Sequence, residues 1–429
     1  MIIFCDDLGY GDLGVFGHPT INTPNLDRLA NEGQKWTNFY AAASVCTPSR
    51  AGILTGRYPI RSGMCSDKRR VLFPNSAGGL PQSEITIARA LKKVGYNTAC
   101  IGKWHLGHHP QYIPTKHGFD YYFGIPYSND MDAVRKLKRK DHHHPNYKNY
   151  NVPLMRNEEI IERPVYQHTI TKRYSEEAVK FIKENNDKPF FIYLAHNLPH
   201  IPLFVSEKFD GTSQRGLYGD VVEEIDFGVG QIIDTLKQEG LEENTLVVFT
   251  SDNGPWLVYN EHGGSAGLLR EGKGMTWEGG MREPTIFYWK GKVKQGVVSD
   301  IGSTLDLFST ICSIGGAEVP VDRTMDSEDL SPVLFEGKPS PRISFIYYRG
   351  TEIYAARKGA YKAHFITQKA YVKDKNKQYH DPPILYNLNH DPGERNDISE
   401  KHPEVINDIQ DLVDSHVKNL KRGEDQLAK

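Results

Sequence analysis

The chain of 429 residues is poor in cysteine, and its few cysteines do not form a recognisable framework. An odd, small number of cysteines excludes a disulfide-rich scaffold, although one pair would remain possible. No apolar run is long enough to cross a bilayer, so we expect no membrane span. The five cysteines are Cys5, Cys46, Cys65, Cys100 and Cys312.

The chain also lacks an excess of either charge, since 52 lysines and arginines stand against 54 aspartates and glutamates. This balance gives no reason to expect a nucleic-acid partner. There is no Asn-x-Ser/Thr sequon, which weighs weakly against a eukaryotic secretory route, and no signal peptide. Because the chain starts almost inside a strand, at MIIFCDD, we expect a leader to have been removed or left out. We therefore expect an exported protein, either secreted or in a bacterial periplasm.

What the chain does contain is a regular alternation of short β-rich runs and amphipathic stretches up to about residue 334. This alternation predicts an α/β fold, a large mixed and mostly parallel sheet sandwiched by helices. The expected strands are Ile2–Cys5, Thr98–Ile101, Pro189–Leu194, Leu246–Thr250 and Thr285–Trp289. The expected helices are Asn25–Asn31, Ile87–Val94, Tyr174–Glu184, Asp220–Gln238 and Leu305–Ile314.

The sequence texture changes after about residue 334. RISFIYYRG, TEIYAARKG, AYKAHFIT and PILYNLN predict short antiparallel strands, and HPEVINDIQDLVDSHVKNL predicts a terminal amphipathic helix. We therefore expect a large domain over residues 1–334 and a smaller C-terminal α+β domain over residues 335–429, with an antiparallel sheet.

Polar side chains follow four of the predicted strands directly. Because the carboxyl ends of parallel strands meet at one edge of a sheet, where ligands bind in open α/β folds, these side chains should lie together. His200 is a stronger candidate for proton transfer than His196. The residues concerned are Asp6, Asp7, Lys103, His105, His196, His200, Asp252 and Asn253.

Four of these residues, Asp6, Asp7, Asp252 and Asn253, offer hard oxygen ligands. Two neighbouring carboxylates repel each other unless a cation lies between them. Because the set contains no thiolate or imidazole, it favours Ca²⁺, with Mg²⁺ as the alternative, over zinc. Taken singly, each pair is also consistent with a cap or a turn.

Basic residues add positive charge to the same predicted edge. A cationic cluster beside a divalent cation suits a phosphate or sulfate ester, although a solvated lysine is the plain alternative for each lysine. REGKGMTWEGGMREP, at 270–284, is a glycine-rich loop that would let the backbone approach a ligand closely. The basic residues are Arg50, Lys103, His105, His200 and Lys273.

Cys46 stands in an unusual setting, the small polar turn SVCTPSRAGILTG at 44–56. Thr47 can cap the helix predicted to follow, and Pro48 suits its first position. A side chain at this point faces free backbone N–H groups and the positive end of the helix dipole. The turn is therefore a place for reactive chemistry or for anion binding.

Residues 136–149, KLKRKDHHHPNYKN, form a basic, histidine-rich insertion that we expect to be structureless. The plain interpretation is a solvated loop, and the sharper one is an active-site rim that meets an anionic substrate. A metal site built from His142, His143 and His144 is disfavoured, because three adjacent residues rarely face one ion.

Taken together, these motifs resemble the type I sulfatases of the alkaline-phosphatase-like superfamily. The signature is C-x-P-x-R at 46–50, followed by AGILTGRYP. The similarity is greatest to the branch of arylsulfatase A and N-acetylgalactosamine-6-sulfatase. Further segments that resemble the family are DDLGYGDLG, PTINTPNLDRLANEG, GKWHLG, HGFDYYFG, SDNG and LYNLNHDPGERND.

The resemblance implies that a maturation enzyme oxidises Cys46 to formylglycine, whose hydrate has one hydroxyl to attack sulfur and another to expel the product. It implies that the four oxygen ligands hold the metal. It implies that His200, alone or together with Lys273, protonates the leaving oxygen, and that His105 takes a proton from the second hydroxyl. The cations implied to stabilise the sulfate oxygens are Arg50, Lys103 and Lys273.

On the substrate side, the resemblance implies that Ser128 touches the sulfate. Asn129 stands where a close relative has histidine, which puts that substrate contact in doubt, and Asp130 and His196 complete the expected substrate-binding set. Several aromatic side chains could stack on sugar faces or simply pack in the core. These aromatics are Tyr121, Tyr122, Tyr127, Trp256 and Trp277.

The expected function is hydrolysis of a sulfate ester on a galactose- or N-acetylgalactosamine-type saccharide. One alternative is a phosphodiesterase or phosphonate monoester hydrolase on the same scaffold. The other is a catalytically silent glycan-binding relative in which Cys46 stays a thiol.

Overall fold

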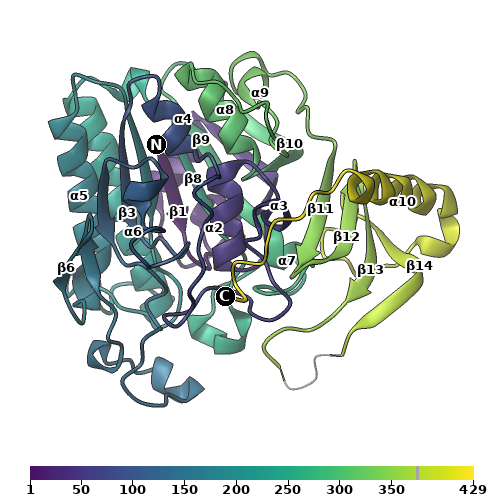
Figure 1. Cartoon of the computed structure of the whole chain (residues 1–429), viewed down its shortest axis with the longest axis horizontal. Helices are drawn as coiled ribbons and strands as arrows, with labels where there is room; N and C mark the ends of the chain where they lie inside the picture. The colour runs from purple at the N-terminus through teal and green to yellow at the C-terminus, as the bar shows by residue number, and fades with distance from the viewer. Residues whose placement is uncertain (373–375) are drawn as a thin grey trace.

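The computed structural model describes residues 1–372 and 376–429 and contains two β-sheets, a large one and a smaller C-terminal one (Figure 1). Five adjacent strands at the centre of the large sheet, from β8 to β4, run parallel. In spatial order its ten described strands are β10 (Gly296–Ser303), β2 (Gln34–Tyr40), β9 (Arg282–Tyr288), β8 (Val247–Ser251), β1 (Ile2–Cys5), β7 (Phe190–Ala195), β3 (Asn97–Gly102), β4 (Tyr121–Gly124), β5 (Leu154–Arg156) and β6 (Glu159–Glu162).

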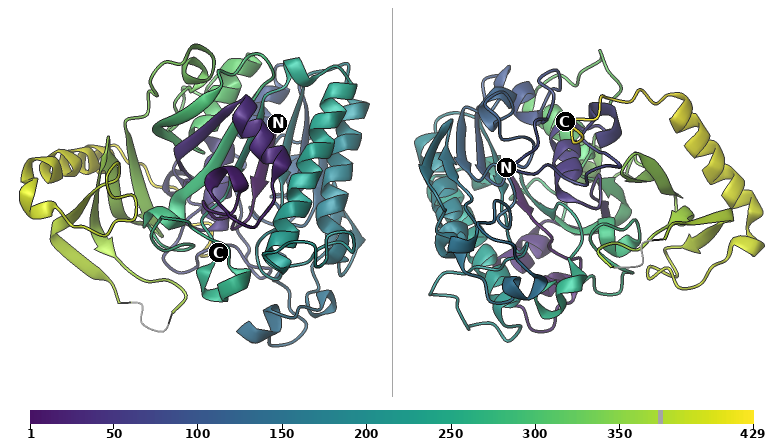
Figure 2. Two further views of the ribbon diagram at one scale, coloured as in Figure 1. Left: turned by 180° about the vertical axis from the view of Figure 1, so that it is seen from behind. Right: turned by 60° about the horizontal axis from the view of Figure 1, so that its bottom comes forward.

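Helices cover both faces of the large sheet, as the sequence predicted. On β1 the side chains of Ile3 and Cys5 pack against one helical layer, and those of Ile2 and Phe4 against the other, because successive strand residues point to opposite faces. The first layer consists of α1 (Pro24–Glu32), α5 (Ile170–Glu184) and α6 (Leu217–Gln238), which lie over one face in Figure 2. The second consists of α2 (Cys46–Thr55), α4 (Ile87–Lys92), α8 (Asp306–Gly315) and α9 (Ser331–Glu336).

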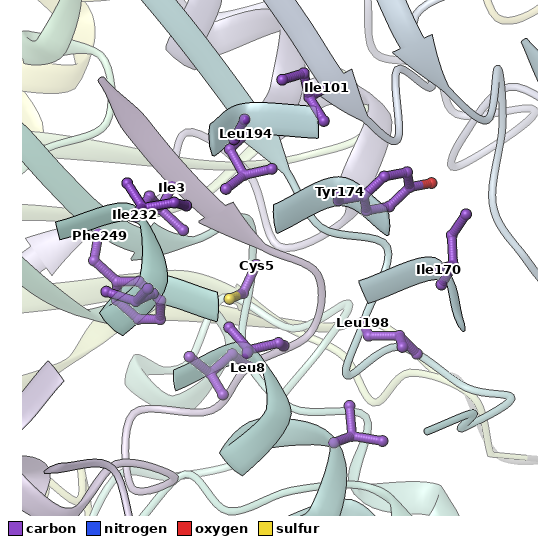
Figure 3. Close-up of a cluster of buried hydrophobic side chains, with 14 of the residues drawn as sticks. Ile3, Cys5, Leu8, Ile101, Ile170, Tyr174, Leu194, Leu198, Ile232 and Phe249 are labelled. Carbon is purple, nitrogen blue, oxygen red and sulfur yellow. The ribbon is translucent and has the colours of Figure 1, made fainter. Parts of the chain in front are cut away.

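The core under the first layer reaches the carboxyl end of β1. Figure 3 shows Cys5 and Leu8 among apolar side chains from neighbouring strands and helices, including Leu194, Ile232 and Phe249. These side chains are almost fully buried, so they fix the backbone that leads into Asp6. The remaining short helices of the large domain are α3 (Pro59–Ser62) and α7 (Glu278–Met281).

The C-terminal region forms a four-stranded antiparallel sheet backed by one helix, α10 (Pro403–Lys418), as predicted (Figure 1). Ile409 and Val413 of α10 pack on this sheet in the same core as Tyr347 and Ala355. The strands are β11 (Ser344–Arg349), β12 (Glu352–Lys358), β13 (Tyr361–Thr367) and β14 (Gln378–Asn387).

The end of the chain does not stay with the C-terminal sheet. After α10 it returns to the large domain, where the N–H of Gly423 donates to Ile60 and the N–H of Gln426 donates to Gly63. Leu427 is fully buried in the same core cluster as α2 and α4. A single boundary at residue 334 therefore does not separate all packing contacts, and the division at that residue remains a prediction.

The five strands and five helices expected from the sequence are present, with ends shifted by a few residues. The sequence missed β4, β5 and β6 at one end of the sheet and, at the other end, β2 and β10, which pair with each other. β2 and β10 both carry polar residues, and β10 lies at the sheet edge with half of its residues exposed, so neither has the apolar signature of a buried strand.

All five cysteines are free. In the described part of the chain, no helix is both apolar and long enough to traverse a membrane.

Two local predictions were wrong. The insertion at 136–149 is not structureless, since it contains the 3₁₀ helices η3 (Arg139–His142) and η4 (Tyr147–Asn149). Thr47 does not cap α2: the helix begins at Cys46, and the hydroxyl of Thr47 donates to the carbonyl of His105 and accepts from Leu72. Thr47 instead ties α2 to the segments that follow β3 and α3.

Candidate active site

The carboxyl ends of four adjacent parallel strands bring the predicted polar residues together. Asp6 follows β1, Asp252 follows β8, Lys103 follows β3 and His196 follows β7. All four side chains are at most 1% exposed. Charged groups are rarely buried so completely without partners, so their contacts define the site.

Three carboxylates and one amide meet at this edge. The backbone N–H of Asp7 donates to Asp252 Oδ1 at 3.1 Å, and Asn253 Nδ2 donates to Asp7 Oδ1 at 2.7 Å. Asp7 has a φ of 63°, in the left-handed region that a non-glycine residue enters at some energetic cost. The strained turn aims Asp7 toward the same space as Asp6.

Each carboxylate has a cationic partner. Lys103 Nζ donates to Asp6 Oδ2 at 2.5 Å, and Lys273 Nζ lies 2.6 Å from Asp7 Oδ1. Arg50 donates through Nε and Nη2 to Asp252 Oδ2 at 3.1 and 2.9 Å. Its third donor, Nη1, reaches the carbonyl of Lys103 at 3.0 Å. Arg50, which lies within α2, therefore holds Asp252 and the backbone of Lys103 in place through these hydrogen bonds.

The side chain of Cys46 points into the same cluster. Its Sγ lies 3.4 Å from Asp6 Oδ1 and 3.5 Å from Lys273 Nζ. Burial, together with the charge of Asp6, raises the pKa of the Cys46 thiol, so an unmodified cysteine here is neutral near pH 7. The helix N-terminus does not produce a thiolate at this position.

Two histidines flank the cluster. His200 Nε2 lies 3.7 Å from Asp7 Oδ2, while its Nδ1 is 2.5 Å from the carbonyl of Ile201. His105 has a φ of 58°, and its Nε2 is 2.8 Å from the carbonyl of Leu72 while its buried Nδ1 has no partner. Burial lowers the pKa of both histidines, so both are neutral near pH 7.

The residues predicted to bind the substrate make fewer contacts with the carboxylate cluster. Ser128 accepts from Lys103 Nζ at 3.2 Å and so borders the cluster. The amide of Asn129 donates to Gln167 and to Pro202, which leaves its buried Oδ1 without a partner. Asp130 also has an unpartnered buried oxygen, and burial raises its pKa.

His196 is buried beside Tyr174, with ring centroids 6.2 Å apart, and its Nδ1 has no partner. Burial lowers its pKa to about 4. It follows β7 as predicted, although no contact joins its side chain to the carboxylates.

The charges of the cluster are unevenly compensated. Although burial raises the pKa of Asp6, the nearby Lys103 and His200 hold it well below its usual range. Burial raises the pKa of Asp7 to about 6 against the effect of Lys273, and burial with the repulsion of Asp6 raises that of Asp252 to about 7. Glu283, fully buried nearby, has no hydrogen-bond partner on either carboxylate oxygen.

This donor set fits a hard divalent cation. The buried Oδ1 of Asn253 has no hydrogen-bond partner, although the amide lies against Asp7. A carbonyl-type oxygen and three carboxylates are the ligands that Ca²⁺ and Mg²⁺ prefer. Asp6, Asp7, Cys46 and His200 also offer atoms within 4.8 Å of one another.

The insertion at 136–149 borders this site. Arg139 Nη2 donates to the carbonyl of Tyr371 at 3.3 Å, and the ring of Tyr371 lies 4.9 Å from that of Trp256. Trp256 in turn lies under Lys273, whose Nζ is 4.5 Å from the ring centroid. The insertion therefore lies at the rim of the site, and its contact with an anionic substrate remains a prediction.

The three adjacent histidines of the rim do not converge on one point. His142 lies 2.9 Å from the hydroxyl of Tyr150, whereas His143 lies with Glu261 and His262. Of the five aromatics considered from sequence, Trp256 contacts catalytic candidates, being 5.3 Å from the ring of His200. Tyr122 and Trp277 are buried in core clusters instead.

Sequence reasoning missed Arg70, Arg349 and Tyr371 as neighbours of this site. A Cβ on Gly274 would lie 3.1 Å from Arg70 Nη1 and 2.8 Å from the Tyr371 ring, so both border the loop that carries Lys273. The basic run KRR at 68–70 was a weak signal for Arg70. No local pattern marks Tyr371.

Comparison with known proteins agrees with this geometry. A family model described as Sulfatase matches residues 1–317, and a model described as the C-terminal region of aryl-sulfatase matches residues 340–429. The chain therefore belongs to the sulfatase family, the sulfuric ester hydrolases, as the sequence motifs predicted.

Individual relatives resemble the chain over nearly its whole length. Arylsulfatase A of Bos taurus is 40% identical over 442 residues, covering 96% of this chain and 86% of that protein. N-acetylgalactosamine-6-sulfatase of Mus musculus is 39% identical over 467 residues, covering 100% and 87%. The crystal structure of PsFucS1 sulfatase from Pseudoalteromonas sp. has a TM-score of 0.87 at 30% identity, covering 98% of this chain and 91% of that one.

Proposed function

We propose that this sulfatase removes a sulfate ester from a galactose- or N-acetylgalactosamine-type saccharide, using formylglycine made from Cys46. The observation that carries the proposal is the position of Cys46 Sγ, 3.4 Å from Asp6 and 3.5 Å from Lys273. Residue 46 thus sits between a metal-ligand carboxylate and a cation, where both charge and geometry suit a sulfate ester.

Asp6, Asp7, Asp252 and Asn253 would hold Ca²⁺, or Mg²⁺ in its place. When bound, such an ion polarises a sulfate oxygen and favours the ionised form of a neighbouring hydroxyl. The hydrate of formylglycine would supply two hydroxyls, which a thiol or a serine lacks. A maturation enzyme that acts on the segment around Cys46 is therefore a required partner.

The basic residues divide into two roles. Lys103 and Lys273 reach the edge of the cluster beside Ser128 and Cys46, so they would meet the sulfate oxygens directly. All three donor nitrogens of Arg50 are engaged by Asp252 and a backbone carbonyl. Arg50 is therefore better suited to positioning Asp252 than to binding sulfate, which revises its expected role.

The two histidines would move different protons. His200, beside Asp7 and near the ring of Trp256, would protonate the leaving oxygen of the sugar. His105, with its free Nδ1, would accept a proton from the second hydroxyl and so release sulfate. Both are neutral near pH 7, so His105 is ready as a base while His200 first needs a proton.

The substrate class rests on the relatives and on the rim. One relative is by name an N-acetylgalactosamine-6-sulfatase, which acts on a sulfated amino sugar. Trp256 offers an aromatic face beside His200, and the basic insertion offers charge for further sulfates. Such saccharides lie outside the cell, so the proposal includes export to a periplasm or the medium.

The test is steady-state kinetics on paired substrates with protein produced alongside a formylglycine-generating enzyme. We expect kcat/KM for an aryl sulfate to exceed that for the matching aryl phosphate, and a panel of defined sulfated sugars to identify the natural class. A much higher kcat/KM for the phosphate would instead assign a phosphohydrolase on this scaffold.

Mass spectrometry of the peptide that contains Cys46 gives a second readout, independent of turnover. The proposal predicts the aldehyde and its hydrate in protein from the native source. A persistent thiol there would support the silent glycan-binding alternative.

A further inference from the structure

Two arginines approach each other at the junction of the C-terminal sheet and the large domain. Arg349 ends β11, and Arg70 lies in the segment between α3 and α4. Both line one cavity of about 40 Å³, together with Ser44 and Val45, the residues just before Cys46. The cavity therefore opens beside the start of α2.

Among the residues that the structure describes, no carboxylate neutralises either guanidinium. Arg349 donates to the backbone carbonyls of Gln368 and Lys369, and Arg70 stacks on Tyr371 at 4.6 Å. Within residues 1–372 and 376–429, neither forms an ion pair with a carboxylate. Nη1 of Arg70 is buried and has no hydrogen-bond partner. Burial, together with the charge of Arg70, lowers the pKa of Arg349 to about 10.

A buried donor without a partner, next to a second cation, is unfavourable unless an anion accepts its hydrogen bond. Each charged hydrogen bond that is not formed costs free energy. Tyr371 holds Arg70 from one side, and its own φ of 59° is a strained value for a bulky residue. The pair is thus held in place rather than left in solvent. A planar guanidinium pair suits a sulfate or a carboxylate.

We propose that Arg70 and Arg349 form an anion-binding subsite for a second negatively charged group of the saccharide whose sulfate ester is removed. This inference rests on the proposed function and narrows it to substrates with at least two anionic groups. Pockets for whole ligands measure roughly 300–1,000 Å³. The cavity is far smaller, so it fits a charged substituent and not a sugar ring.

The subsite adjoins the loop that carries Lys273, since Gly274 is one of the residues that line the cavity. Gly274, between Lys273 and the cavity, donates its N–H to the carbonyl of Ser44 at 2.8 Å. A side chain at position 274 would meet Arg70 and Tyr371, so glycine is needed there for the close approach. The second anion would bind one substituent away from the sulfate held by Lys273.

Calorimetric titration tests the subsite without turnover, on the full chain carrying Cys46→Ser. The probes are sucrose octasulfate, an oligogalacturonate and inorganic sulfate, which separate a sulfate from a carboxylate and both from the reaction site. We expect Arg70→Gln and Arg349→Gln each to weaken the binding of one of the two saccharide probes by about 10- to 100-fold. This corresponds to the loss of one charged hydrogen bond. Binding of inorganic sulfate should change by less than about twofold.

Arg69→Gln is the matched control, because it removes the same charge one residue away. Arg69 donates to Asn75 and Ser76 at the surface and does not line the cavity. Equal losses in all three variants, or none in any, would overturn the subsite. Thermal unfolding confirms that each variant is folded. Failure of the proposed function would appear separately, as absent aryl sulfate hydrolysis with the binding pattern intact.

Discussion

Two buried clusters of charge in the described part of the chain are balanced in opposite ways. In the candidate site, four buried carboxylates face three cations, because Glu283 has no partner, and burial raises the pKa values of Asp7 and Asp252 to about 6 and 7. At the junction of the two sheets, Glu278 is also fully buried. There Lys362 and Arg282 overcome the effect of burial and lower the pKa of Glu278 to about 2.

The junction cluster is closed on itself. Lys362 Nζ, on β13, lies 2.9 Å from Glu278 and 3.0 Å from Glu394, and His364 is 2.6 Å from Glu394. Tyr40 donates to Glu278 at 2.6 Å. These bonds join α7 of the large domain to the C-terminal sheet, so the cluster holds the two parts together.

The comparison shows that burial of charge does not by itself mark function. The informative property is which charge, negative or positive, is in excess within a buried cluster. Excess buried carboxylate, as in the site, calls for a cation from outside the chain. A cluster in which each carboxylate oxygen meets a protein donor has no such requirement and serves stability.

The largest expected effect is that of Cys46→Ala, which should reduce activity without reducing stability. Loss of the nucleophile should lower kcat/KM for an aryl sulfate by at least about 10³-fold, as removal of a nucleophile does in other hydrolases. The melting temperature should stay nearly the same, because the side chain makes no strong bond. Cys312→Ala, on the buried face of α8, should show the reverse: lower stability and retained activity. Retained activity in Cys46→Ala would contradict the assignment of Cys46 as the precursor of the nucleophile.

Glu278→Gln should instead destabilise the fold. It leaves Arg282 and Arg357 less compensated in a buried setting, so we expect a loss of about 3 kcal/mol in the free energy of unfolding. The melting temperature should fall by roughly 3–4 °C. Glu158→Gln, which breaks the exposed pair with Lys116, is the control and should change stability by less than about 0.5 kcal/mol. Similar melting temperatures for the two variants would contradict the structural role of the junction.

Calcium should stabilise one cluster only. At a concentration about 100 times Kd, a bound ion adds about 2.7 kcal/mol to the free energy of unfolding. A chelator should therefore lower the melting temperature of the wild type and added Ca²⁺ should restore it, followed by scanning calorimetry. Asp252→Asn should lose this response, while Glu278→Gln should keep it. An unchanged response in Asp252→Asn would place the ion elsewhere.

The smallest effect concerns the rim. Lys136→Gln combined with Lys140→Gln removes two exposed charges of the insertion and leaves both buried clusters intact. We expect KM for a sulfated oligosaccharide to rise by about three- to tenfold, since electrostatic attraction to the substrate weakens. KM for a small aryl sulfate should not change. Equal changes for both substrates would assign the insertion to general stability.

Much of the site was predictable because local rules coincide with the fold. Asp6, Lys103, His196 and Asp252 each follow an apolar run, and parallel pairing carries all such positions to one edge. The roles of Thr47 and Arg50 were not predictable in this way. Their contacts depend on how α2 packs against β3 and β8, which no local pattern specifies.

The sequence by itself determined the family, the mostly parallel α/β class and the types of chemical group available, because periodicity and short motifs are local properties of the chain. Only the tertiary structure decided which charges are compensated, that Arg70 meets Arg349, and that residues 423–427 return to the large domain. Those outcomes depend on distances between segments hundreds of residues apart, and electrostatic energy is set by distance and burial rather than by composition.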